Sequence, residues 1–250
     1  MGTFGPLPIF SQLDLLLLKL SVGSQGGKEV AKHSKPFLAC VLALIVITLL
    51  SGCNKKSEGD QAFDFMEKAA AEEQTFNEQQ QPLVDEEKKE QDLYNKIMNV
   101  DVKDDKQVSK YSDQALASIE KRQKMMEKEK KSIDSAYKLF QKAVPHINKV
   151  KEEKAQKPGK QTIENMEKRY EAFGDLYKVY TASITDDQKL FKLMTNKKLT
   201  TEDLQKQLKV VNDHYESIEK NKETFNKYTE SFNKEKQSFY SALGIKSKNK

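Results

Sequence analysis

Apolar residues recur at intervals of three and four along most of the chain after residue 60. The clearest series lies near the C-terminal end, where an apolar residue occupies every seventh position: Leu204, Val211, Ile218, Phe225, Phe232 and Phe239. A repeat of this period places its members on one face of an α-helix. Leu208, Tyr215 and Leu243 fill intervening positions, while the remaining ones are polar: Lys222, Thr229 and Lys236. The pattern predicts a long helix with a narrow apolar seam.

The ends of this helix are also marked. Thr200 precedes Glu202 and Asp203, as expected of an N-cap followed by an acidic first turn. Gly244 follows Leu243 and is suited to the left-handed position after a helix.

Three earlier segments show the same alternation. The segment before residue 200 carries Ile163, Met166, Tyr170, Phe173, Tyr177, Tyr180, Ile184, Phe191 and Met194, with Asp187 as the one polar residue in the series. The segment before it carries Val108, Tyr111, Ala115, Ile119, Met126, Ile133, Phe140, Val144 and Ile147. The first begins near Gln61 and carries Phe65, Ala69, Phe76, Leu83, Tyr94 and Ile97.

Prolines and turn residues predict where these segments bend or end. We expect Pro82 to bend the first segment and Pro145 to kink or end the second. Pro158-Gly159 is expected to separate the second segment from the third. The stretch 99–105, which contains three aspartates, is expected to connect the first two segments and to cap the second.

Four segments of about 35–50 residues predict an all-α fold, an elongated antiparallel up-and-down bundle over residues 61–245. At about 1.5 Å per residue the bundle would be about 55–65 Å long. The alternative is a three-helix bundle with one helix partly detached. Apolar residues make up 37% of the chain, and 12 Phe and 9 Tyr remain to build a core. We therefore attribute the low apolar fraction to narrow seams on long helices and not to disorder.

The N-terminal fifth of the chain is a different kind of sequence. A basic patch precedes an uncharged run over residues 37–50, which as a helix would span about 21 Å and is short for a permanent membrane span. The run ends in Leu50-Ser51-Gly52-Cys53, which resembles the lipobox of bacterial lipoproteins. That resemblance implies diacylglyceryl transfer to the Cys53 thiol and cleavage between Gly52 and Cys53. The alternative is an uncleaved N-terminal anchor with an incidental cysteine.

These observations divide the chain into expected parts. Residues 30–52 are expected to form the signal peptide and residues 53–60 a lipid-anchored tether, and residues 246–250 a flexible basic tail. We interpret residues 1–29 as a misassigned leader, since Val30 can be encoded by the start codon GTG. Gly26-Gly27 just upstream can be encoded by GGAGG, a ribosome-binding sequence.

The expected mature chain offers little for catalysis. Cys40 falls in the signal peptide, so Cys53 would be the single cysteine and it would be acylated. Gly159 and Gly174 are isolated, which excludes a glycine-rich phosphate loop. Of the three histidines, His33 precedes the cleavage point, and His146 and His214 read as surface or edge residues. We expect no enzyme activity, no metal, no cofactor and no small-molecule substrate.

Two features could serve binding. Tyr170, Tyr177 and Tyr180, near Phe173, form an aromatic stripe that is more typical of a helix core than of a sugar-stacking or peptide-binding groove. The chain has 41 Lys but two arginines, Arg122 and Arg169. Lysine favours diffuse attraction to an anionic polymer over bidentate phosphate recognition. Residues 53–250 carry 39 basic and 36 acidic residues, a balance unlike that of a nucleic-acid-binding protein.

The lipobox, the helical region that follows it, and the sequence Phe-Asn-Lys-Tyr-Thr-Glu-Ser-Phe-Asn-Lys-Glu-Lys at 225–236 resemble the YkyA-like cell-wall-binding lipoproteins of Firmicutes. The resemblance implies a helical bundle attached to the outer face of the cytoplasmic membrane, within the wall. We therefore expect a non-enzymatic protein that is anchored to membrane lipid through acylated Cys53 and tethers the membrane to anionic wall polymer. The alternative is a helical adaptor that binds another envelope protein.

Overall fold

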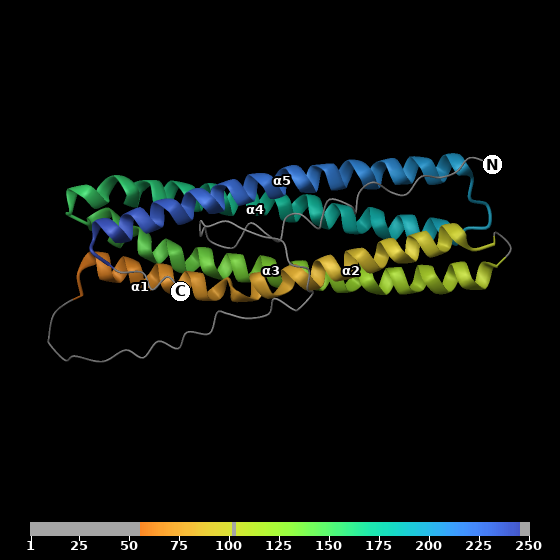
Figure 1. The fold of residues 1–250 in the computed structure, drawn as a ribbon, viewed down its shortest axis with the longest axis horizontal. Coiled ribbons are helices and arrows are strands. Elements are labelled where there is room, and N and C mark those ends of the chain that lie inside the picture. Colours follow the sequence, from red (N-terminus) through yellow and green to blue (C-terminus); the bar gives the residue numbers. More distant parts are fainter. Residues whose placement is uncertain (1–55, 102–103, 246–250) are drawn as a thin grey trace, which may run out of the picture. The chain divides into compact units, whose positions relative to one another are not determined.

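The computed structural model describes residues 56–101 and 104–245, and within these ranges every regular element is a helix. The helices run along one long axis (Figure 1). In chain order they are α1 (Glu58–Glu72), α2 (Gln74–Asn99), α3 (Asp105–Lys149), α4 (Glu153–Met194) and α5 (Thr201–Ala242).

The helices pack as an antiparallel bundle. α1 and α2 follow one another along α3, α3 packs against α4, and α4 packs against α5 (Figure 1). The predicted four-helix architecture is therefore confirmed, with its first helix in two pieces. Because α1 and α2 both lie against α3, neither is detached, and the three-helix alternative does not apply.

The apolar seams form the core as predicted. The six residues of the seven-residue repeat in α5 are each at most 7% exposed. They join seam residues of the other helices in three buried clusters that follow one another along the bundle. Burial of these side chains supplies most of the drive for folding, because each helix alone is a thin amphipathic rod.

The helix ends bear out the predicted caps. The Thr200 hydroxyl accepts a hydrogen bond from the backbone N–H of Asp203 at 3.1 Å, and the Asp104 carboxylate accepts one from Gln107 at 3.1 Å. Gly244 has a φ of +69°, the left-handed conformation expected after a helix end. α1 begins earlier than the expected Gln61, because Ser57 and Asp60 form a reciprocal capping box that starts the helix at Glu58.

The predicted boundary at Pro158-Gly159 is wrong. Both residues lie inside α4, and the chain turns earlier, between Lys149 and Glu153. Pro145 also does not end α3, which continues to Lys149. Ile147 and Val150 beyond this proline are each 4% exposed, so their packing against the core holds the last turn in place despite the lost backbone hydrogen bond.

The first helix is interrupted at Glu73, whereas Pro82 lies inside α2. Ser132 of α3 bridges the interruption: its hydroxyl donates to the carbonyl of Glu72 at 2.5 Å and accepts from the N–H of Phe76 at 3.2 Å. A side chain from the neighbouring helix thus satisfies backbone groups on both sides of the break.

Gly159 marks a close approach of three helices. A Cβ atom at this position would lie 2.9 Å from Cγ2 of Ile147 in α3 and 3.0 Å from the ring of Phe239 in α5. Both neighbours are buried and cannot easily move aside. The glycine therefore serves helix packing and not the turn that the sequence suggested.

We expect Gly159→Ala to lower the free energy of unfolding by about 1–3 kcal/mol, because the added methyl group overpacks the core. Gly174 in the same helix is the matched control, since no heavy atom lies within 4 Å of a Cβ built there. Gly174→Ala should raise stability by up to about 1 kcal/mol through helix propensity. Urea denaturation followed by circular dichroism measures both changes, and equal effects would contradict the packing role of Gly159.

Candidate functional site

The described part of the chain holds three places where polar side chains gather: a buried centre around Arg122, a second around Arg169, and an open pocket at the turn between α2 and α3. The expected lipidation and cleavage residues, Cys53 and Gly52, lie outside the described residues.

Arg122 connects four helices. It lies in the α3 seam between Ile119 and Met126, and its side chain is 0% exposed. Its Nη1 atom donates to Glu90 of α2 at 2.5 Å, and it lies 3.2 Å from Asp187 of α4 and 3.3 Å from the hydroxyl of Tyr215 of α5. Its Nε atom donates to the Tyr180 hydroxyl of α4 at 3.1 Å. Arg122 thus has four partners on three other helices: Glu90, Asp187, Tyr215 and Tyr180.

The partners of Arg122 are bonded to one another. The Tyr215 hydroxyl donates to Asp187 at 3.2 Å, and the Tyr180 hydroxyl donates to Glu87 of α2 at 2.5 Å. Glu87, Glu90 and Asp187 are each at most 4% exposed. We call Arg122, its four partners and Glu87 the Arg122 centre; besides Arg122 it comprises Glu87, Glu90, Tyr180, Asp187 and Tyr215.

Burial governs the ionisation of the acidic groups in and beside this centre. Desolvation raises the pKa of Glu90 to about 8 despite the attraction of Arg122, and it also raises the pKa of Asp187. About two helical turns farther along α3, Glu129 is buried without an arginine partner. Its pKa rises to about 8 because of burial, although Gln80 donates a hydrogen bond to it at 2.8 Å.

Burial alone would lower the pKa of the Arg122 guanidinium. The attraction of Glu90 and Asp187 outweighs that effect and holds the pKa well above its ordinary value. Arg122 therefore stays charged inside the bundle, and its nearby acids supply the counter-charge.

Arg169 forms a second buried centre at the break in the first helix. Its two terminal nitrogens donate to the two carboxylate oxygens of Glu73, at 2.6 and 2.8 Å, and its Nε atom donates to Thr229 of α5 at 2.9 Å. The guanidinium lies 5.0 Å from the ring centre of Phe225. The fork geometry of arginine thus ties α4 to the helix break and to α5.

Neither centre is open to a substrate. Arg122 is 0% exposed and Arg169 is 5% exposed, and the space beside Glu90 and Asp187 is about 10 Å³, no more than one water molecule needs. Both centres therefore hold helices together, although perturbed pKa values such as those of Glu90 and Asp187 often mark catalytic sites.

Sequence reasoning missed both centres. Arg122 and Glu129 occupy positions of the three-and-four alternation in α3, as Glu87 and Glu90 do in α2, but the pattern of apolar residues does not identify them as core positions. Asp187 and Thr229 stand out in the sequence as polar residues in a seam, but their arginine partners do not. A usable signal was present, because both arginines of a chain with 41 lysines fall on seam positions.

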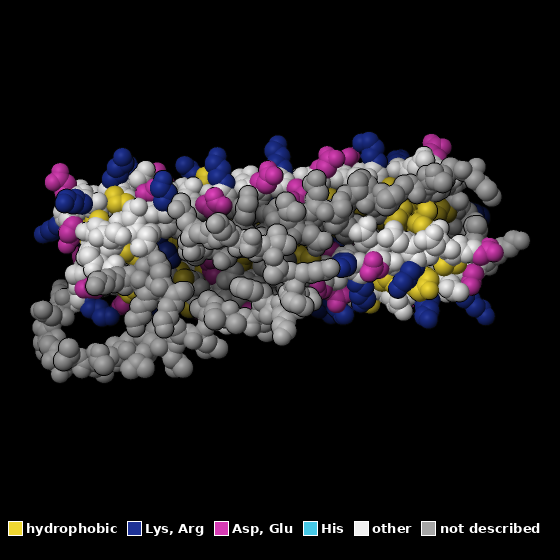
Figure 2. Space-filling view, viewed as in Figure 1, with side chains coloured by type: hydrophobic (Ala, Val, Ile, Leu, Met, Phe, Trp, Pro, Cys, Tyr) yellow, Lys and Arg dark blue, Asp and Glu magenta, His cyan; other side chains and the backbone are white. Residues whose placement is uncertain are grey.

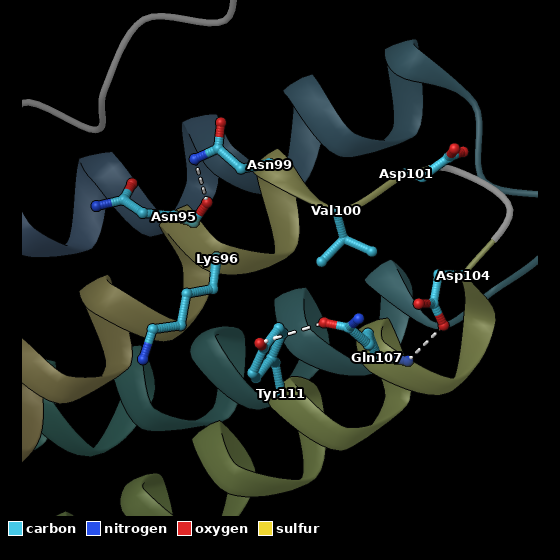
Figure 3. A pocket seen from close by; sticks show the side chains of 8 residues that line it. All are labelled: Asn95, Lys96, Asn99, Val100, Asp101, Asp104, Gln107 and Tyr111. Carbon is cyan, nitrogen blue, oxygen red and sulfur yellow. Dashed lines mark hydrogen bonds between the residues drawn. The ribbon is translucent and has the colours of Figure 1, made fainter.

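The pocket at the α2–α3 turn has a volume of about 480 Å³ (Figure 3). Its polar groups largely bond to one another: the Tyr111 hydroxyl donates to Gln107 at 3.3 Å, and Asn99 donates to the carbonyl of Asn95 at 2.8 Å. Lys96 lies 5.9 Å from the Tyr111 ring centre. The lining brings together no nucleophile with a base; it consists of Asn95, Lys96, Asn99, Val100, Asp101, Asp104, Gln107 and Tyr111.

The aromatic stripe of α4 does not form one platform. Tyr180 is buried in the Arg122 centre, in agreement with the core interpretation. Tyr170 is half-buried, stacks on Tyr137 of α3 with ring centres 3.9 Å apart, and donates to Asp134 at 2.9 Å. The side chains of the stripe thus contact α3 and the core and do not line a shared groove.

The two described histidines lie at helix contacts. His146 Nδ1 is 2.7 Å from Glu58 and its ring stacks on Phe65, while His214 Nε2 is 2.9 Å from Asp186. Among residues 56–101 and 104–245, no three His, Cys, Asp or Glu side chains are grouped to hold a metal ion. In the same ranges no helix is apolar and long enough to cross a membrane.

Comparison with known proteins gives a match over most of the described chain. The sequence profile of the YkyA family, described as "Putative cell-wall binding lipoprotein", matches residues 57–242. The "Uncharacterized lipoprotein YkyA" of Bacillus subtilis (strain 168) is 33% identical over 209 residues, which are 84% of this chain and 92% of that protein. A crystal structure of a conserved protein of unknown function from Staphylococcus aureus has a TM-score of 0.63 at 17% identity. It covers 75% of this chain and 98% of its own, and supports the fold.

We expect Arg122→Met to lower the free energy of unfolding by about 3–5 kcal/mol near pH 7, because it leaves buried carboxyl groups without their cation. The loss should shrink in acid, where Asp187 also binds a proton in the folded protein, as Glu90 already does near pH 7. Lys124→Met on the exposed face of the same helix is the control and should change stability by less than about 0.5 kcal/mol. A loss from Arg122→Met no larger than that of the control would show that the centre contributes little.

The pKa values also predict that stability falls with rising pH. Glu90 and Glu129 have folded pKa values of about 8, above the ordinary 4.5, so the folded state binds their protons more tightly than the unfolded state. The contribution of these two groups to the free energy of unfolding is complete below about pH 4.5 and is lost as pH rises through about 8. For each group the free energy of unfolding falls by up to about 1.4 kcal/mol per pH unit.

Glu129→Gln should therefore flatten the fall in denaturation midpoint between pH 5 and pH 9. Glu127→Gln removes an exposed carboxylate from the same helix and should leave the slope unchanged. If both variants keep the wild-type slope, burial of Glu129 is not the source of the pH dependence.

Proposed function

Because the chain belongs to the YkyA family of cell-wall binding lipoproteins, we propose that it is a lipid-anchored tether on the outer face of the cytoplasmic membrane. Acyl chains on Cys53 hold it in the bilayer, and the helical bundle binds anionic polymer of the wall. The observation that carries this proposal is the position of Cys53, in a lipobox-like motif directly before the bundle.

The similarity to the Bacillus subtilis lipoprotein supports the anchor. It spans 84% of the chain, and any continuous stretch of that length within 250 residues includes Leu50–Cys53. The motif therefore lies within the region shared with a protein that is named a lipoprotein. Two acyl chains at one cysteine are sufficient for stable attachment, whereas a single chain gives reversible binding.

The distance between anchor and bundle is short. α1 begins at Glu58, five residues after Cys53, so the connecting chain can extend at most about 18 Å. The end of the bundle at which α1 starts is thus held near the bilayer. α3 has 45 residues and, as a helix, a length of about 67 Å, so the bundle can reach well beyond the lipid headgroups.

The bundle suits contact with an extended polymer better than enclosure of a small molecule. Its two arginines are buried in the core, so the exposed cations of the described residues are lysines. Lysine and acidic side chains are distributed along the whole length of the helical unit (Figure 2). A surface of this kind supports many weak, salt-sensitive contacts instead of one specific site.

Fractionation of cells that express Cys53→Ala tests the proposal. The wild-type protein should sediment with membranes, and the variant should appear in the soluble extracytoplasmic fraction, because it cannot be acylated. Cys40→Ala is the matched control and should stay with membranes, since Cys40 lies in the segment that is removed. Membrane retention of both variants would favour the uncleaved-anchor alternative.

The second arm of this test uses purified cell walls and a salt series. The full-length protein in neutral detergent should sediment with walls at low ionic strength and be released as salt rises above about 0.15 M, where the screening length falls below about 8 Å. Absent binding, or binding indifferent to salt, would contradict electrostatic attachment to the wall.

A further inference from the structure

Charge is unevenly distributed among the helices of the bundle. α1 and α2 together carry 11 acidic and 4 basic residues, whereas α3 carries 11 basic and 6 acidic residues. The near-neutral balance of the whole chain therefore conceals an acidic helix pair beside a strongly basic helix.

The lysines of α3 lie on one exposed face. At 100° per residue, nine of them fall within a sector of about 100°, and they extend over about 65 Å of helix. Every one of the nine is exposed. We call this set the α3 lysine ridge: Lys106, Lys110, Lys121, Lys124, Lys128, Lys131, Lys138, Lys142 and Lys149.

Most of the ridge is not neutralised by the protein. Among the described residues, Lys121 forms an ion pair with Glu86 of α2 at 2.9 Å, and the other eight lysines form none. Of the exposed acids of α3, Asp113 and Glu120 lie within the sector of the ridge and Glu127 lies just outside it. Nine lysines against these acids leave the ridge with an excess of positive charge. The remaining α3 lysine, Lys130, pairs with Asp134 at 2.6 Å and lies off the ridge.

A row of like charges 65 Å long is costly to hold on one helix unless an opposite charge covers it, since lysines one turn apart repel one another. The acidic residues of α1 and α2 do not cover it, apart from Glu86. The ridge is therefore a surface with an excess of one charge and a regular, linear layout, which matches an extended polyanion and not a single bound anion.

The composition of the ridge also distinguishes a polymer from a membrane surface. Helices that lie on bilayers insert Trp, Phe or Leu next to their basic residues. Between its lysines the same sector of α3 contains Ala117 and Ser135, and its two larger uncharged side chains, Leu139 and His146, are half-buried. Leu139 packs against a core cluster, and the His146 ring stacks on Phe65 of α1. The ridge can attract a charged chain, but its larger side chains pack on the protein and no large exposed apolar side chain accompanies the lysines.

Resting on the proposed function, we infer that the α3 lysine ridge is the surface of the bundle that binds linear wall polyanion. The polymer lies along α3, and its negative groups pair with successive ammonium groups and release counterions. The acidic α1–α2 pair beside it keeps the polymer on that face.

The test compares two variants with equal loss of charge. The ridge variant neutralises four ridge lysines through Lys124→Gln, Lys128→Gln, Lys131→Gln and Lys138→Gln. The control variant neutralises four exposed lysines of α5 through Lys206→Gln, Lys220→Gln, Lys227→Gln and Lys234→Gln. None of the eight lysines forms an ion pair with another described residue, so both variants should keep the wild-type circular dichroism and unfolding midpoint.

Binding to long-chain inorganic polyphosphate is measured with full-length protein in neutral detergent across a salt series. The ridge variant should bind at least about tenfold more weakly at low salt, and its slope of log affinity against log salt should be smaller by about 3, because about 0.7 counterion is released per contact with a single chain. The control variant should stay within about threefold of wild type, since its lysines lie on another helix. Equal losses in the two variants would overturn the inference, because net charge and not position would then set affinity.

Two further outcomes separate this inference from the proposed function. If wild type binds purified walls but the ridge variant binds them equally well, the ridge is not the contact surface and the tether proposal stands. If wild type does not bind walls, the proposed function fails whatever the polyphosphate result. Binding to phosphatidylglycerol vesicles is measured in the same way. If the ridge variant loses vesicle binding but keeps its polyphosphate binding, the ridge contacts the membrane and the inference is overturned.

Discussion

The bundle depends on one desolvated guanidinium, that of Arg122, which is bonded to α2, α4 and α5 from its place in α3. Apolar seams that repeat every seven residues pack almost equally well when one helix slides by a whole repeat, so they leave the register of long helices poorly defined. A slide of one heptad, about 10 Å, would leave Arg122 and its acids buried without partners, at a cost of several kcal/mol. Arg169, Glu73 and Thr229 apply the same constraint farther along, at the helix break. Two charged anchors thus specify one alignment where apolar packing would permit several.

The need for buried charged anchors explains why the chain places its arginines and its lysines in different environments. Arginine, with a planar fork and weak hydration, can be buried against a carboxylate, as Arg169 is against Glu73. Lysine is a compact and strongly hydrated charge that is better kept in water, where it remains available to a partner. The two arginines of the chain are accordingly inside the bundle, and the lysines of α3 are outside it. A count of all basic residues adds the buried arginines, which hold helices together, to the exposed lysines, which can meet a partner. For this reason the net charge of the chain indicates little about its function.

Periodicity was enough to predict the helices, their seams and the caps at Asp104, Thr200 and Gly244, because each depends on residues close together in sequence. The helix breaks were not predictable in this way. Pro158 suggested an end that does not exist, and the real interruption at Glu73 is held by Ser132, 59 positions away in sequence. The Arg122 centre was missed for the same reason: the role of a charged residue in a seam can be recognised only when its partner on another helix is known.

The lysine ridge, by contrast, is visible from the helical spacing of α3 alone. Cys53 and its motif lie outside the described residues, so the anchor remains a prediction from sequence.

A tether of this kind does not require a pocket. In the proposed arrangement, acyl chains would fix the start of α1 near the bilayer, and the bundle would sample only a thin shell of the wall. Every polymer segment in that shell would then be presented at a high effective concentration. Contacts of single lysines, each worth less than about 1 kcal/mol at an exposed surface, then suffice if many of them act along one chain. A rigid rod is better for this than a flexible tail, because a fixed row of charges binds an extended polymer without first losing conformational freedom. In this proposal the buried centres and the exposed ridge serve the same end: the centres fix the alignment of α3 over its 45 residues, and the ridge uses that alignment to bind polymer.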